Sequence, residues 1–315
     1  MPRSLRLCFS LLAVLLLLVI TAGTTSASQS GAHYLKVKGA HGGKPSRGSL
    51  LSYRGGAIES APRVFIIWWG PDWKTGFSTG AYTSAKAQNY VQSFFGNVGG
   101  STWSATDTQY CQGVANGSAS YPATATHAGN PSSELGGIWN DTSALPSSIT
   151  QSAIAAEAVA ATAVFGYSAQ ADYMIFTPSG HSQSGFATSW CAYHGSTSSS
   201  GGSISYSYMP FQPDAGASCG MNFVNSTDNA FGNGYFDGFS IVGGHEYAET
   251  VTDPFPSSGW VDSRGSEIGD KCAWISSPNQ GASRNITLGA NDYAVQSLWS
   301  NAFNSGAGGC VTQYP

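Results

Sequence analysis

The chain has 315 residues, of which only 10% are charged, with 13 Lys and Arg against 17 Asp and Glu. No Lys or Arg occurs between Lys86 and Arg264, so the sequence has no basic surface to neutralise phosphates, and we do not expect nucleic acid as a partner. The low charge and the abundance of Gly, Ser, Thr and Asn are typical of an extracellular protein with many turns.

Residues 1–27 have the pattern of a secretory signal peptide. Arg3 and Arg6 form a basic region, residues 11–20 are apolar but too few to span a bilayer, and small residues precede a cleavage point after Ala27. An uncleaved anchor is the alternative, which the short apolar run disfavours. We therefore expect a secreted mature chain of residues 28–315, monomeric and not membrane-bound, with 11 basic and 17 acidic residues and a net charge of −6.

Two regions are expected in the mature chain: a flexible lead-in or short pro-segment at 28–60, and a single domain at 61–315. Apolar periodicity and Gly or Pro boundaries predict the elements of this domain. We expect strands at 63–69, 172–178 and 202–210, helices at 83–100, 147–166, 239–253 and 291–303, and loops with short strands at 101–146. The segment 180–202 is too polar to be expected in the core. This order predicts an α+β fold with a late site helix.

Carboxylates cluster near that helix. Six of the acidic residues fall within 246–270, namely Glu246, Glu249, Asp253, Asp262, Glu267 and Asp270. Such a cluster is unfavourable unless something offsets the repulsion, and a divalent cation is one solution. On a helix, His245 and Glu249 lie on one face and can reach one ion, while Glu246 points about 100° away. A solvated acidic helix face with an incidental histidine is the alternative.

The stretch HEYAETVTDPFPSSGWVDSRGSEIGD resembles the site segment of the thermolysin-type zinc peptidases. That resemblance implies a zincin-like fold with a mixed sheet and an active-site helix, and one Zn²⁺ held by His245, Glu249 and Glu267. It also implies that Glu246 is the general base and that Asp270 orients His245 from behind. Glu249 departs from the family, which has a second histidine at that position.

A wider resemblance covers most of the mature chain. The pieces YRGGAI, FIIWWGPDW, CAYHG, HEYAETVTDP, EIGDKC and VQSLWSN before a final cysteine are similar to the EXORDIUM or phosphate-induced family of secreted proteins. Plant members of that family are known as growth-related wall proteins. The resemblance therefore implies an alternative in which a metal holds the structure of a non-catalytic extracellular protein.

Glu249 alters the electrostatics expected of the site. One His and two Glu leave a Zn²⁺ site with about zero net charge, whereas two His and one Glu leave about +1, so a bound water should ionise less readily. A second carboxylate ligand also allows divalent ions other than Zn²⁺. His194, in CAYHG, can restore an imidazole or act as an electrophile near an oxyanion; the alternative is a loop histidine beside a disulfide.

Five cysteines remain after the expected cleavage, so at most two disulfides form within the chain. Cys191 and Cys219 flank the strand expected at 202–210, and Cys272 follows the candidate ligand segment. We predict Cys191–Cys219 and Cys272–Cys310, with Cys111 unpaired; the family resemblance supports the bond to the final cysteine.

The function predicted from these patterns is hydrolysis of peptide bonds in a protein or peptide substrate by a metal-activated water, with Glu246 and His194 as candidate catalytic residues. The non-catalytic extracellular protein remains the alternative. An acid glutamic peptidase is a third possibility. It requires a Glu–Gln pair in a β-sandwich, which the helical spacing around Glu246 disfavours.

Overall fold

A computed structural model describes residues 31–39 and 49–314 of the chain. The predicted signal peptide therefore lies outside the described residues, as do residues 28–30 and 40–48 of the predicted lead-in. The centre of the molecule is one six-stranded sheet with the order β1-β10-β11-β9-β3-β8. Its strands are β1 (His33–Lys36), β3 (Arg63–Trp69), β8 (Leu135–Asp141), β9 (Ala171–Phe176), β10 (Trp190–Ser199) and β11 (Gly202–Met209).

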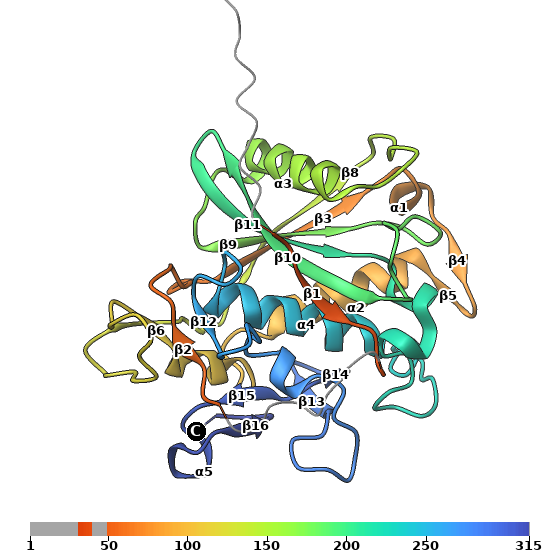
Figure 1. Ribbon diagram of the computed structural model, residues 1–315. Coiled ribbons are helices and arrows are strands. Elements are labelled where there is room, and N and C mark those ends of the chain that lie inside the picture. Colours follow the sequence, from red (N-terminus) through yellow and green to blue (C-terminus); the bar gives the residue numbers. More distant parts are fainter. Residues whose placement is uncertain (1–30, 40–48, 315) are drawn as a thin grey trace, which may run out of the picture.

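The sheet is mixed. Strands β11, β9, β3 and β8 run parallel to one another, whereas β10 is antiparallel to both β11 and β1. Helix α3 (Gln151–Phe165) covers one face, and helices α2 (Ser84–Asn97) and α4 (Asp237–Thr252) cover the other (Figure 1). The α+β class and the mixed sheet are thus as predicted.

Local signals explain where two of these helices begin. The hydroxyl of Thr83 accepts a hydrogen bond from the backbone of Lys86 at the start of α2, and Thr150 accepts one from Ala153 at the start of α3. Such N-caps satisfy backbone donors that have no partner inside the helix. The core-facing stripe of α2 is apolar at helical spacing and consists of Ala87, Tyr90, Val91, Phe94 and Phe95.

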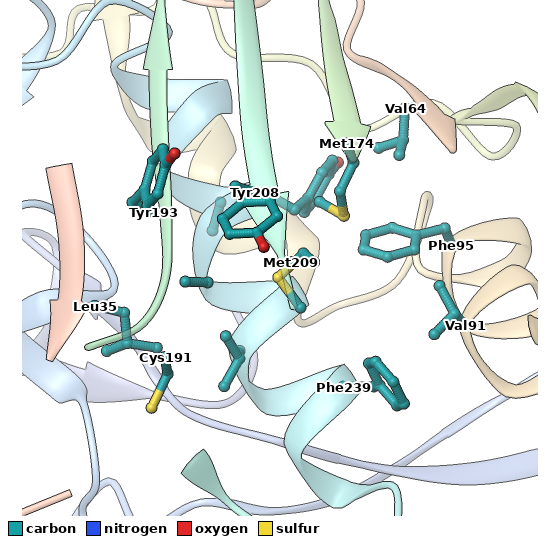
Figure 2. Close-up of a cluster of buried hydrophobic side chains, with 14 of the residues drawn as sticks. Leu35, Val64, Val91, Phe95, Met174, Cys191, Tyr193, Tyr208, Met209 and Phe239 are labelled. Carbon is teal, nitrogen blue, oxygen red and sulfur yellow. The ribbon is translucent and has the colours of Figure 1, made fainter. Parts of the chain in front are cut away.

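The main core lies between the sheet and the pair α2 and α4. Met174 of β9 and Met209 of β11 point towards Phe95 of α2 and Phe239 of α4 (Figure 2). Because helices cover both faces of the sheet, β3 and β9 are buried along almost their whole length rather than at alternate positions. Burying each large apolar side chain stabilises the fold by about 1.5–3 kcal/mol, so this layer fixes α4 against the sheet.

Short elements surround this frame. They are β2 (Ser52–Tyr53), α1 (Asp72–Thr75), β4 (Ser78–Thr79), β5 (Tyr82–Thr83), η1 (Ser104–Gln109), β6 (Cys111–Gln112), β7 (Thr126–His127), η2 (Gln212–Cys219), β12 (Trp260–Val261), η3 (Asp270–Cys272), β13 (Arg284–Leu288), β14 (Asn291–Val295), β15 (Leu298–Ser300), α5 (Phe303–Gly306) and β16 (Gly309–Val311). The C-terminal strands lie beneath α4, on the side away from the sheet (Figure 1). Helix α4 is therefore enclosed, and every one of its residues is buried.

The helix predicted at 291–303 is wrong. Residues 291–295 form β14, which pairs with β13, and residues 298–300 form β15, which pairs with β16. The consecutive residues Tyr293, Ala294 and Val295 are all buried, because β14 packs directly on α4. A run buried on both faces has no period, so its apolar pattern did not distinguish strand from helix.

The expectation that segment 180–202 lies outside the core is also wrong. Strand β10 begins within it, and residues 190–197 are buried. The strand is hydrogen-bonded on both edges, to β1 and to β11, which satisfies its backbone despite the polar side chains. Part of the predicted flexible lead-in is likewise ordered, since residues 33–36 form the edge strand β1.

The cysteines pair as predicted. Cys191 is bonded to Cys219 and Cys272 to Cys310, while Cys111 is buried and unpaired. Two disulfides are consistent with an oxidising, extracellular environment. Among the helices of the described residues, none combines the length and hydropathy that crossing a membrane requires.

Candidate metal centre

Helix α4 supplies three side chains to the candidate site. The imidazole Nε2 of His245 lies 3.0 Å from Oε1 of Glu249, one turn further along the helix. Glu246 lies between them in sequence, and all three side chains are fully buried. Gly243 and Gly244 make this depth possible, because a Cβ there would lie 3.3 Å from Phe95 and 3.1 Å from Trp103.

Strand β10 supplies His194. Its Nδ1 atom lies 3.3 Å from Oε2 of Glu246 and 3.5 Å from Oε2 of Glu249, and its Nε2 lies 3.4 Å from Oε2 of Glu267. The side chain is fully buried in the middle of the strand. His194 therefore faces three of the carboxylates and belongs to a strand rather than to a loop.

Glu267, just before η3, and Asp270, the first residue of η3, also belong to the site. The backbone N–H of Asp270 donates to Oε1 of Glu249 at 3.1 Å, and the N–H of Glu267 donates to Oδ2 of Asp270 at 3.1 Å. Cys272 follows directly and is tied by its disulfide to Cys310. These bonds hold η3 and the residues before it against the end of α4.

His33 is a site residue that the sequence did not suggest. Its Nε2 lies 2.7 Å from Oδ2 of Asp270, and its Nδ1 lies 3.3 Å from Oε1 of Glu267. It sits on β1, directly opposite His194 in the strand register, and the two rings lie 5.6 Å apart. This pairing joins positions 161 residues apart, so no local pattern in the sequence could have shown it.

Gln296, just after β14, is the second site residue that the sequence did not suggest. Its Nε2 donates to the carbonyl oxygen of Gly269 at 2.8 Å, so its Oε1 is the acceptor for Nδ1–H of His245 at 3.1 Å. That contact leaves the Nε2 lone pair of His245 free to bind a cation. Asp270, predicted to orient His245, lies 4.0 Å from its Nε2 and contacts His33 instead.

The arrangement is suited to a metal ion. Three groups each bring three ligand atoms within 4.8 Å of one another: His33, Glu249 and Asp270; His194, Glu249 and Glu267; and His245, Glu246 and Glu249. Several of the buried atoms have no hydrogen-bond partner in the described part of the chain, namely His194 Nε2, His245 Nε2, Glu246 Oε1, Glu249 Oε2 and both oxygens of Glu267. Buried polar atoms normally have partners, and a cation would supply the missing ones.

The electrostatics point the same way. Burial, and then the neighbouring carboxylates, raise the pKa values of Glu246 and Glu267 well above their usual range. Burial lowers the pKa of His194 well below its usual value. Burial would also lower the pKa of His33, but Asp270 and Glu249 outweigh it and raise that pKa to about 9. A divalent cation would favour the ionised carboxylates and so counteract both causes of the raised pKa values.

The structure thus gathers every residue that the sequence singled out as a ligand or catalytic group. His245 contacts Glu249, and His194 contacts both Glu246 and Glu267. Comparisons of the chain with family models, curated proteins and solved structures give no match. The resemblances to the thermolysin-type peptidases and to the EXORDIUM family therefore stay predictions.

Proposed function

We propose that this protein is a secreted, zincin-like metallopeptidase that binds a divalent cation at the cluster around Glu249 and hydrolyses peptide bonds there. The proposal rests on six fully buried ligand atoms that have no hydrogen-bond partner among the described residues and that belong to residues of ligand groups sharing Glu249. Leaving that many buried polar atoms without partners would cost several kcal/mol, at about 1–3 kcal/mol each. A bound ligand that contacts these atoms would offset this cost.

The donor set indicates which ion fits. His194 and His245 offer nitrogen, while Glu249 and Glu267 offer carboxylate oxygen, a mixture typical of Zn²⁺ sites. The high share of oxygen also suits Mn²⁺ and other ions that prefer carboxylates. We propose Zn²⁺ as the native ion, because two imidazoles lie within reach of Glu249.

The bound cation would polarise the scissile carbonyl and lower the pKa of a water molecule. Glu246 is placed to receive the proton of that water, since its Oε1 has no hydrogen-bond partner in the described structure and it lies in one ligand group with His245 and Glu249. His194 Nδ1 lies 3.3 Å from Oε2 of Glu246, so His194 could orient this carboxylate for proton transfer. Glu246 can then pass its proton to the leaving amine.

Replacement of the general base tests this function. Glu246→Gln should keep the fold and the metal but reduce turnover of a casein or peptide substrate by at least about 100-fold, because an amide cannot accept the proton. Glu157→Gln is the matched control, since Glu157 is buried on α3, on the opposite face of the sheet. Unchanged turnover in the Glu246 variant would contradict the proposed role.

A second candidate function has one specific observation in its favour. The side chains of His194, His245, Glu246, Glu249 and Glu267 are all fully buried, with no surface open to solvent. A metal in such a site can act purely as a structural clamp, as in the non-catalytic extracellular protein that the EXORDIUM resemblance implies. Metal-dependent thermal stability without hydrolysis of casein or peptide libraries would favour this second function.

A further inference from the structure

The outer part of the cluster differs from the part on which the proposed function depends. The side chains of His33 and Asp270 are 19% and 18% exposed, whereas those of His194, His245 and Glu267 are fully buried. His33 and Asp270 contact each other at 2.7 Å, and with Glu249 they form a ligand group of their own. The cluster thus has a buried half and a half that reaches the surface.

Glu249 stands between the two halves. Its Oε1 accepts a hydrogen bond from the backbone N–H of Asp270, a residue of the outer half, and lies 3.0 Å from Nε2 of His245. Its Oε2 lies 3.5 Å from Nδ1 of His194, in the buried half, and has no hydrogen-bond partner in the described residues. Glu249 is also the one member that all three ligand groups have in common. A carboxylate in this position is suited to bridge two cations.

The charges support two ions rather than one. Four carboxylates surround the site, those of Glu246, Glu249, Glu267 and Asp270, and when all are ionised they carry −4. One divalent cation would leave −2 on these carboxylates, of which a protonated His33 could offset one, whereas two cations would neutralise all four.

We propose that the site holds two divalent cations bridged by Glu249, the second bound by His33, Asp270 and Glu249. The first ion occupies the buried half with His194 and Glu267. This inference rests on the metal binding of the proposed function but not on catalysis. It also gives β1 a role, since this short edge strand places His33 opposite His194 and so completes the second subsite.

Metal stoichiometry tests the inference on the full mature chain. After equilibrium dialysis against Zn²⁺ and elemental analysis, wild type should hold two ions per chain and His33→Ala one. Asp270→Asn, which removes one of the charges that hold the second ion, should also fall to one. His181→Ala is the matched control and should keep two, because His181 is 46% exposed and contacts Asp72 instead. A single ion in wild type, or two in His33→Ala, would overturn the second subsite.

Loading with Mn²⁺ gives a second readout that does not depend on counting. Two ions bridged by one carboxylate lie about 3.5–4 Å apart in known two-metal sites, so wild type should show a spin-coupled electron paramagnetic resonance spectrum. His33→Gln, a milder change at the strand, should show the spectrum of an isolated ion. An uncoupled spectrum in doubly loaded wild type would overturn the bridge.

These results separate the two proposals. Two ions in a protein that hydrolyses no peptide would overturn the peptidase proposal and support the bridged pair. One ion in an active peptidase would support the peptidase proposal and overturn the bridged pair.

Discussion

Asp172 should make the free energy of unfolding depend on pH. It lies on β9 in the middle of the sheet and is fully buried. Its Oδ2 accepts a hydrogen bond from Ser207 at 2.7 Å, but its Oδ1 has no partner among the described residues. Burial raises its pKa from 3.8 to about 7, and the bonds from Ser207 offset only part of that effect. The folded state therefore favours the protonated acid.

The sign and size of the effect follow from linkage. Because the folded pKa exceeds the unfolded one, the folded chain binds a proton that the unfolded chain has released, and stability falls as the pH rises from about 4 to about 7. Each pH unit between the two pKa values costs about 1.4 kcal/mol. From pH 5 to pH 8, Asp172 alone should remove about 3 kcal/mol from the free energy of unfolding.

Asp172→Asn removes this titration while keeping an oxygen that can accept from Ser207. Urea unfolding at pH 5 and pH 8, with disulfides intact and chelator present, should show that wild type loses about 3 kcal/mol more than the variant. Other buried carboxyl groups, such as Glu134 with its pKa raised to about 8 by burial, remain in both proteins and cancel. Asp292→Asn, on the exposed tip of the β13–β14 hairpin, should behave like wild type. Equal losses in wild type and Asp172→Asn would refute the reasoning.

Two further predictions concern η3 and the glycine before it. A Cβ at position 269 would lie 2.5 Å from Nδ1 of His245, so Gly269→Ala should displace the imidazole. Metal affinity, measured by competition with a chromophoric chelator, should fall by about 10- to 100-fold, and unchanged affinity would show that His245 does not bind the metal. The disulfide between Cys272 and Cys310 spans 38 residues. Replacing both cysteines with Ser should lower the free energy of unfolding, measured by urea titration, by about 4 kcal/mol. A loss below about 1 kcal/mol would contradict the loop-closure argument.

Local patterns predicted the part of the site that α4 carries. The spacing from His245 to Glu249 places both on one helix face, and the structure has them 3.0 Å apart. The disulfide from Cys272 to Cys310 was also predicted, with support from the EXORDIUM resemblance. The helix spacing depends only on neighbours in sequence, which the amino-acid sequence records directly.

The rest of the site depends on pairings that are far apart in sequence. His33 approaches Asp270 because β1 pairs with β10, and Gln296 approaches His245 because the hairpin β13–β14 packs under α4. Strand β10 itself was hidden by its Ser, Thr and His content, since polar residues in a buried strand have no distinctive period. Tertiary packing, not local propensity, decides both the strand and its partners.

Metal analysis of purified mature protein, alongside Glu249→Gln, tests the central claim most directly. Glu249 is common to all three ligand groups, and the amide keeps the shape of the side chain but not its charge. Wild type should retain divalent metal after gel filtration and lose thermal stability when chelated, while the folded variant retains almost none. A wild type that holds no divalent metal after exposure to Zn²⁺, or a Glu249→Gln variant that holds as much as wild type, would contradict the metal centre.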